Sequence, residues 1–187
     1  YINQGAYQGG TPGTYADSGL ELGNFASHGV DLEDLDGDGD LDAWVVNGGQ
    51  LANRVWINQG GVQGGTPGTY ADSGQTLGNS DSYDVALGDL DGDGDLDAWV
   101  ANRNTQANRV WINQGGDQGG TPGTYADSGQ ALGNSFSCGV ALGDVDGDGD
   151  LDAWVANGIN QANRVWINQG GLQGGTPGTS ADSGAAG

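Results

Sequence analysis

The chain alternates short apolar runs with polar, glycine-rich stretches, and this pattern returns every 55 residues. Within residues 20–74 it predicts four short strands and no helix, at His28–Leu35, Ala43–Asn47, Arg54–Gln59 and about Thr69–Ser73. The second and third strands are nearly all apolar, whereas a strand with one wet face would alternate. An unbroken apolar strand indicates cover on both faces of its sheet. Blades stacked face to face around an axis provide such cover, and so would sheets stacked along a fibre.

Internal repeats organise the whole chain. Three complete repeats occupy residues 20–74, 75–129 and 130–184, followed by a tail at 185–187. Residues 1–19 match the last third of a repeat and predict only its third and fourth strands. We therefore expect an all-β fold of tandem four-stranded antiparallel blades of β-propeller type, with three full blades plus a half-blade. The alternative is an open linear stack of the same repeats in a fibre.

The most distinctive segment of each repeat is an acidic loop, Asp34-Leu-Asp-Gly-Asp-Gly-Asp-Leu-Asp42 in the first. Asp stands at loop positions 1, 3, 5, 7 and 9, and Gly39 at position 6 permits a sharp bend. Calcium takes six to eight oxygen ligands from carboxylates and backbone carbonyls. Without a cation, five carboxylates in nine residues repel one another. The loop therefore predicts a Ca²⁺ site, to which position 7 contributes its carbonyl.

One Ca²⁺ per complete repeat gives three in this chain. The predicted metal residues are Asp34, Asp36, Asp38, Asp40, Asp42, Asp89, Asp91, Asp93, Asp95, Asp97, Asp144, Asp146, Asp148, Asp150 and Asp152. A solvated acidic turn is the plainer interpretation of one such loop, since Asp-Gly is common in turns, but three copies in one register argue against it. Mg²⁺ fits less well because it keeps its waters, and the loops offer no His or Cys for zinc.

The loop pattern Asp-x-Asp-Gly-Asp-Gly-x-x-Asp and the apolar run Ala43–Val46 resemble the FG-GAP/VCBS repeat. Residues 53–58, Asn-Arg-Val-Trp-Ile-Asn, also resemble the VCBS pattern. This family forms the calcium-loop blades of integrin-α-like β-propellers and of many bacterial surface proteins. The resemblance covers nearly the whole chain and implies calcium in the loops and an extracellular or cell-surface setting. It implies no particular ligand, and the long Gly-Gly-Thr-Pro-Gly-Thr connection is less typical of it.

Composition narrows the functional classes. With 25 acidic residues, 4 Arg and no Lys, the formal charge is −21, which argues against nucleic-acid binding. One His, one Cys and no Lys leave little for acid–base or covalent catalysis, so no enzyme is expected. Cys138 takes the place of Tyr83 and His28 in the other repeats, which favours a packing role over a nucleophile. No apolar run has the length of a membrane span. Without an initial Met or a signal peptide, the sequence is expected to be a processed product or a stretch of something longer.

Three repeated features have two interpretations each. Six Trp could stack on sugars, but Trp44 and Trp56 stand inside apolar strands, which favours core packing. The Arg at the start of each third strand, such as Arg54, fits a structural ion pair better than an active site. Pro67-Gly68 is typical of a type II turn, and the Thr beside it could be O-glycosylated or belong to a plain connector.

Differences between the repeats gather in two places, before the first strand and between the second and third. In an up-and-down blade these connections lie on the edge opposite the acidic loops. Loops on a rigid scaffold are where binding residues usually sit, so Tyr83, Arg103, Asn104 and Phe136 are predicted to mark a contact face; neutral drift on exposed loops is the alternative. We expect an extracellular calcium-binding module for adhesion, ligand binding or scaffolding, or else a subunit of a self-assembling filament or surface layer. Expected partners are copies of the chain or further repeats, and a protein or glycan ligand.

Overall fold

The computed structural model describes residues 2–3, 11, 13–170 and 173–184, and within them the fold is all-β. The first repeat forms one antiparallel sheet in the order β3-β4-β5-β6. Its strands are β3 (Ser27–Glu33), β4 (Asp42–Asn47), β5 (Arg54–Asn58) and β6 (Tyr70–Asp72). The register pairs Val30 with Val45 and Trp44 with Val55. The predicted strands are present, with ends that differ by one or two residues.

The second and third repeats build equivalent sheets. One contains β7 (Ser82–Gly88), β8 (Asp97–Asn102), β9 (Arg109–Asn113) and β10 (Tyr125–Asp127). The other contains β11 (Ser137–Gly143), β12 (Asp152–Asn157), β13 (Arg164–Asn168) and β14 (Ser180–Asp182). The strands β1 (Ile2–Asn3) and β2 (Tyr15–Ala16) pair with each other in the register of β5 and β6. The expected fold of tandem four-stranded blades with a half-blade is confirmed.

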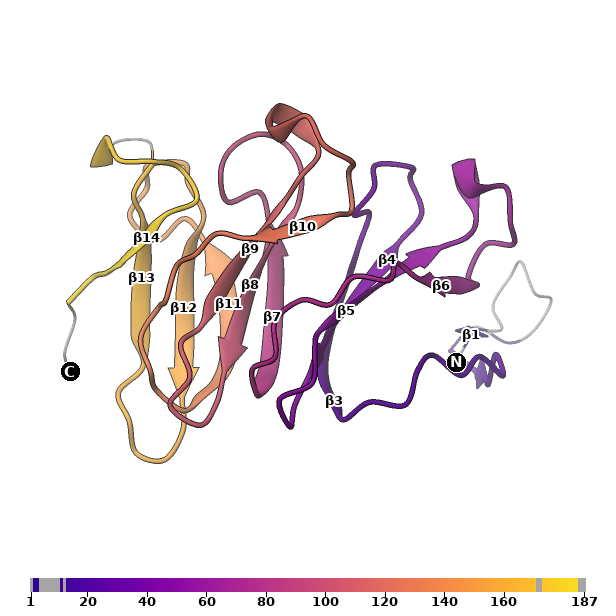
Figure 1. The fold of residues 1–187 in the computed structure, drawn as a ribbon, viewed down its shortest axis with the longest axis horizontal. Coiled ribbons are helices and arrows are strands. Elements are labelled where there is room, and N and C mark those ends of the chain that lie inside the picture. The colour runs from indigo at the N-terminus through magenta and orange to yellow at the C-terminus, as the bar shows by residue number, and fades with distance from the viewer. Residues whose placement is uncertain (1, 4–10, 12, 171–172, 185–187) are drawn as a thin grey trace.

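The three sheets lie side by side, and their first strands β3, β7 and β11 are neighbours in space (Figure 1). The sheets do not close into a ring, so the alternative of a linear stack also fits. Figure 1 shows the acidic loops on the same edge as the third-to-fourth-strand connections, and the hairpins between second and third strands on the opposite edge. This arrangement is the one that an up-and-down blade predicts.

The core lies between neighbouring sheets. Trp44 of β4 is fully buried and meets Tyr125 of β10 edge-on, with ring centroids 6.0 Å apart. Every residue of β8, in the middle sheet, is buried. In β12 of the last sheet, however, Trp154 is 52 % exposed. Core packing is thus confirmed for Trp44 and is wrong for Trp154, because no further sheet among the described residues covers that strand.

The connections contain one feature that the sequence interpretation missed. Two short 3₁₀ helices, η1 (Gly61–Gln63) and η2 (Gly116–Gln118), precede the Pro-Gly turns. The turns themselves are of type II, as predicted: Thr69 N donates to Thr66 O at 3.1 Å, and Gly68 has φ +79°. A residue with a side chain would be strained at that φ, so glycine is the residue best suited to this position.

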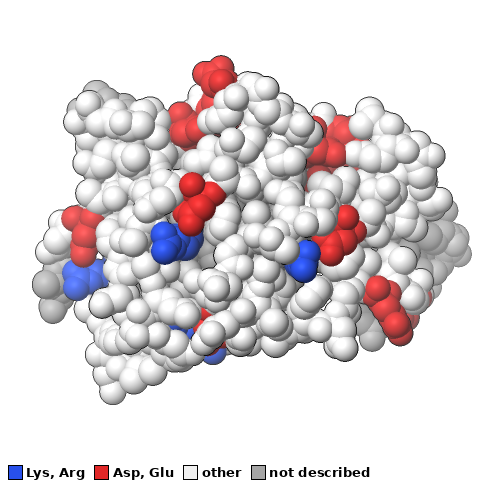
Figure 2. All heavy atoms as spheres, in the orientation of Figure 1, with Lys and Arg blue, Asp and Glu red and all other residues white. Residues whose placement is uncertain are grey.

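Each Arg at the start of a third strand pairs with an Asp of the fourth strand. The N–O distances are 3.6 Å for Arg54–Asp72, 3.9 Å for Arg109–Asp127 and 3.1 Å for Arg164–Asp182. On the face drawn in Figure 2, basic patches lie beside acidic ones on a largely uncharged surface. The structural role predicted for these Arg residues is confirmed.

Candidate metal centre

The loop between β3 and β4 is folded by its own first carboxylate. Asp34 accepts hydrogen bonds from the backbone N–H groups of Gly37 at 2.8 Å, Asp38 at 3.0 Å and Gly39 at 2.9 Å. Gly37 and Gly39 have φ values of +79° and +94°, in the region that favours glycine. The alternation of Asp and Gly therefore bends the chain around Asp34.

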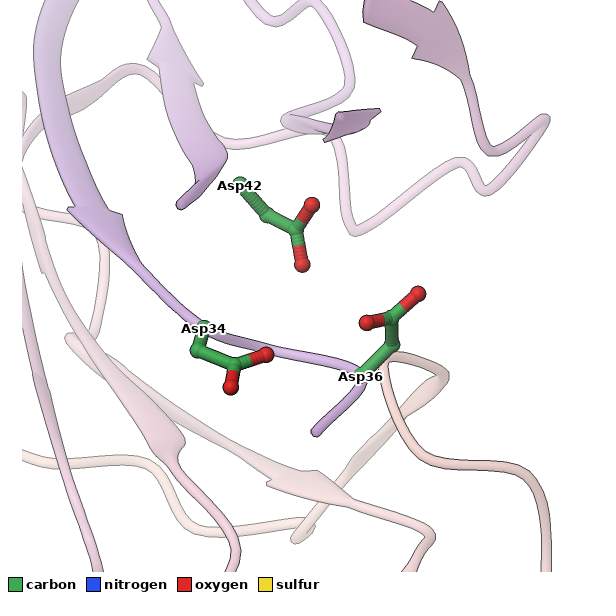
Figure 3. A group of neighbouring side chains, drawn as sticks. All are labelled: Asp34, Asp36 and Asp42. Atoms are coloured by element: carbon green, nitrogen blue, oxygen red, sulfur yellow. The ribbon is translucent and has the colours of Figure 1, made fainter. Parts of the chain in front are cut away.

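Three carboxylates of this loop converge. One oxygen each of Asp34, Asp36 and Asp42 lies within 4.8 Å of the other two, and Figure 3 shows the three side chains directed toward one space. Asp34 and Asp36 follow β3, whereas Asp42 opens β4, so the strand pairing closes the group. Three such clusters, one per complete repeat, could hold a metal ion. The equivalent residues are Asp89, Asp91 and Asp97 in the second repeat, and Asp144, Asp146 and Asp152 in the third.

Asp42 is the buried member of its cluster. It has no exposed surface, and its two oxygens accept hydrogen bonds from Leu35 N at 3.0 Å and Asn58 N at 2.8 Å. Burial raises its pKa to about 6, and burial raises the pKa of Asp97 in the second repeat to about 7. Burial, followed by the neighbouring charge of Asp38, raises the pKa of Asp36. A bound cation would stabilise the charged form of these groups.

Asp38 and Asp40, at positions 5 and 7, stand outside the group of three. Asp38 Oδ1 accepts a hydrogen bond from Asp40 N at 2.8 Å. Their other oxygens, Oδ2 of each, are buried without a hydrogen-bond partner, as are those of Asp95, Asp148 and Asp150. Both carboxylates lie close to the start of the connection between β5 and β6. A Cβ added at Gly60 would collide with Asp40, and a Cβ added at Gly61 would meet Asp38.

These orphaned oxygens test whether a metal fits the loops. A buried carboxylate oxygen without a partner is costly, and a cation supplies the missing partner. The donor set of the cluster is all carboxylate oxygen, which suits a hard cation. The residues therefore fit the calcium that the resemblance implies. Ligation by the five predicted Asp of each loop remains a prediction, since three of the five gather in one group.

Gln63 is a site residue that the sequence interpretation missed. Its side-chain amide, in η1, donates to Asp36 Oδ2 at 2.6 Å. Gln118 and Gln173 do the same for Asp91 and Asp146. The residue before this Gln is Val62 in the first repeat and Asp117 in the second, so the Gln is constant beside a variable position. That contrast was the available signal.

The fold brings the residues of the predicted contact face close together, and their contact role remains a prediction. The Arg103 guanidinium lies 3.0 Å from the centroid of the Tyr83 ring and 4.9 Å from that of Phe136 in the next sheet. His28 of the first sheet approaches Tyr83, with ring centroids 5.0 Å apart. Asn104 is exposed and donates to Asp81. These residues form a row across three sheets, on the edge away from the acidic loops.

The family model for the FG-GAP-like repeat matches residues 34–100 and 89–155. The chain therefore belongs to the FG-GAP-like repeat family, as the loop pattern predicted. FG-GAP-like repeats suggest a ligand-binding or structural repeat module. A search of curated proteins finds no match. Within the described residues, no helix has the length and apolar character needed to cross a membrane.

Proposed function

We propose that this chain is an extracellular calcium-binding repeat module that acts in adhesion, ligand binding or scaffolding. The observation that carries the proposal is the threefold recurrence of one carboxylate cluster, with oxygens within 4.8 Å, at the same place in each sheet. Calcium would be held by the clusters, with the buried oxygen of Asp38 and the backbone carbonyl of Asp40 as further ligands. Its role is structural: it removes carboxylate repulsion and joins the two strands that flank each loop.

The proposal assigns no catalysis to the chain. His28 and Cys138 occupy the same position in different repeats and lie in sheets on either side of the middle one. The Asp side chains with a raised pKa belong to the acidic loops, where a bound cation would stabilise their charged forms. The extracellular setting is supported by the family, since FG-GAP repeats are typical of extracellular or surface proteins.

Calorimetric titration of the metal-free protein with CaCl₂ tests the proposal. We expect about three sites per chain, with weaker binding of MgCl₂. Asp91→Ala should remove one site, because it deletes a member of the second cluster. Asp117→Val is the matched control: it removes the same charge from the same repeat, and Val already stands at that position in the first repeat. The proposal would be overturned if titration with CaCl₂ gave no heat of binding, or if both variants lost the same number of calcium sites.

A second candidate function is a structural subunit of a self-assembling filament or surface layer. It is favoured by the apolar side chains that the first and last sheets leave exposed, Val30 and Leu32 at one end and Trp154 at the other. Electron microscopy of the calcium-loaded protein distinguishes the two candidates, since a filament subunit forms threads and an isolated binding module does not.

A further inference from the structure

The two interfaces between sheets within the chain are built from the same repeat positions. At the first, Leu35, Trp44 and Val46 of the first sheet meet residues of the second, Val85 and Tyr125 among them. At the second, Leu90, Trp99 and Ala101 of the middle sheet occupy the positions of Leu35, Trp44 and Val46. The structure thus shows one kind of interface twice, each time between the sheet of one repeat and the sheet of the next.

At the ends of the stack the same positions are open. Trp154 and Val145 are each 52 % exposed, whereas Trp99 is 1 % and Leu90 is 5 % exposed. We call the side of the last sheet that carries Val145 and Trp154 the trailing face. Val145 and Trp154 stand at the positions that pack against the next sheet at both internal interfaces. No sheet among the described residues packs against the trailing face.

The first sheet exposes the residues whose equivalents in the second sheet are buried against the preceding sheet. Val30 is 59 % and Leu22 is 39 % exposed, whereas the matching Val85 and Leu77 of the second repeat are 6 % and 3 % exposed. We call this side of the first sheet the leading face; it carries Leu22, Val30, Leu32 and Tyr70. A groove of about 510 Å³ runs along it. Tyr70 lines the groove and has the position of Tyr125, the residue that meets Trp44 at the first internal interface.

A polar contact repeats with the apolar ones. Asn113 Nδ2 donates to Leu35 O of the preceding sheet at 3.1 Å, and Asn168 Nδ2 donates to Leu90 O at 2.8 Å. The third pair of this series is Asn58 and Val145, which stand at opposite ends of the stack. Asn58 Nδ2 donates to Leu41 O at 3.2 Å, which leaves the second amide hydrogen for a carbonyl such as that of Val145.

We propose that the trailing face of one chain docks on the leading face of a second copy and reproduces the internal interface. Two different faces meet, so the contact is heterologous and propagates into a ring or an open filament. The β1–β2 pair has the register of β13–β14, as the third and fourth strands of a sheet preceding β3 would. This docking deepens the second candidate function and rests on it. Apolar contacts carry the docking, but Val145 lies in the third acidic loop, so the test is made in calcium.

Sedimentation velocity over a concentration series, in calcium, tests the docking. We expect the wild-type chain to form species larger than a monomer as its concentration rises. Trp154→Asp disables the trailing face and Val30→Asp the leading face, and each variant alone should remain monomeric. Val62→Asp is the control, because Val62 is 79 % exposed in η1 and Asp already stands at this position in the second repeat, as Asp117, whose sheet keeps its interface with the first. It should associate like the wild type.

Mixing the two disabled variants gives the decisive result. Trp154→Asp retains the leading face and Val30→Asp the trailing face, so an equimolar mixture should form dimers and stop there. A wild-type chain that stays monomeric, variants that associate normally, or a mixture without dimers would each overturn the proposal. Circular dichroism melting in calcium checks that both variants fold. Calcium titration of the same samples separates the outcomes, because docking can fail while three sites still bind.

Discussion

The side-chain amide of Asn113 donates a hydrogen bond to the backbone carbonyl of Leu35, 78 residues earlier in the chain, at 3.1 Å. Leu35 is position 2 of the first acidic loop, and Asn113 ends β9 of the next sheet. Gly123 of that sheet also lies against the loop, because a Cβ added at Gly123 would be 3.2 Å from Asp36 Cβ. Each candidate metal loop is therefore part of the interface with the following sheet.

This relationship predicts an asymmetric effect of Asn→Asp substitutions. Asn113→Asp removes the donor and sets a carboxylate against the Leu35 carbonyl, so it should lower the free energy of unfolding by about 1–3 kcal/mol. Asn58→Asp is the matched control, since the described contacts of the Asn58 amide are confined to its own sheet. Urea unfolding of the two variants, both in calcium, measures the difference. Equal destabilisation would contradict an inter-sheet role for Asn113.

Calcium should stabilise the fold. A ligand that binds only the native state adds about 2.7 kcal/mol per site at one hundred times its Kd, and under the proposed function the three clusters would be three such sites. Thermal melting should shift to markedly lower temperature in excess chelator and recover when calcium is restored. Asp38→Ala should reproduce part of the loss for one repeat. An unchanged melting curve in chelator would show that the loops fold without a cation.

The stability of the metal-free protein should fall as the pH rises from about 4 to about 7. Asp97 has an ordinary pKa of 3.8 and a folded-state pKa of about 7, so the folded state binds its proton more tightly than the unfolded state does. Stability is then greatest where Asp97 is protonated and is lost as it ionises. Melting should occur at higher temperature at pH 5 than at pH 8.

Saturating calcium should abolish or reverse this order, because calcium binds the ionised carboxylates and competes with protons. Asp97→Asn provides the control in the metal-free protein, where it should reduce the difference between the two pH values. A metal-free protein that melts lower at pH 5 than at pH 8 would contradict the role given to burial of Asp97.

The row of His28, Tyr83, Arg103 and Phe136 predicts a separable effect on the opposite edge. The Arg103 guanidinium over the two rings should contribute about 0.5–1 kcal/mol as a cation–π contact at a partly exposed site. If this row is a contact face, Tyr83→Ala combined with Arg103→Ala should weaken binding or assembly while the calcium-induced shift in melting temperature stays the same. Arg103 is not among the residues with positive φ, so its backbone accepts alanine, and glycine at this position in the other two repeats indicates that the fold does not need a long side chain there. Intact binding and assembly would favour neutral drift.

Much of the fold could be predicted because its determinants are local. The apolar run Ala43–Val46, the Pro67-Gly68 turn and the glycines of the acidic loop each fix a few residues of backbone, and each occurs three times. The partial strand pair at residues 1–19 followed from the repeat register in the same way. The structure adds what distant contacts create, such as the hydrogen bond from Gln63 to Asp36, 27 residues away.

Sequence alone is enough to place the strands, to show which loops carry the carboxylates, and to show that one repeat unit recurs, because hydrophobic periodicity and glycine-dependent bends act within one repeat. The environment of chemically identical positions, in contrast, depends on contacts between sheets. Trp44, Trp99 and Trp154 share the local sequence Asp-Ala-Trp-Val, yet the first two are buried and the third is half exposed. Burial depends on whether another sheet is present to cover the strand, and that is a property of the stack rather than of the repeat.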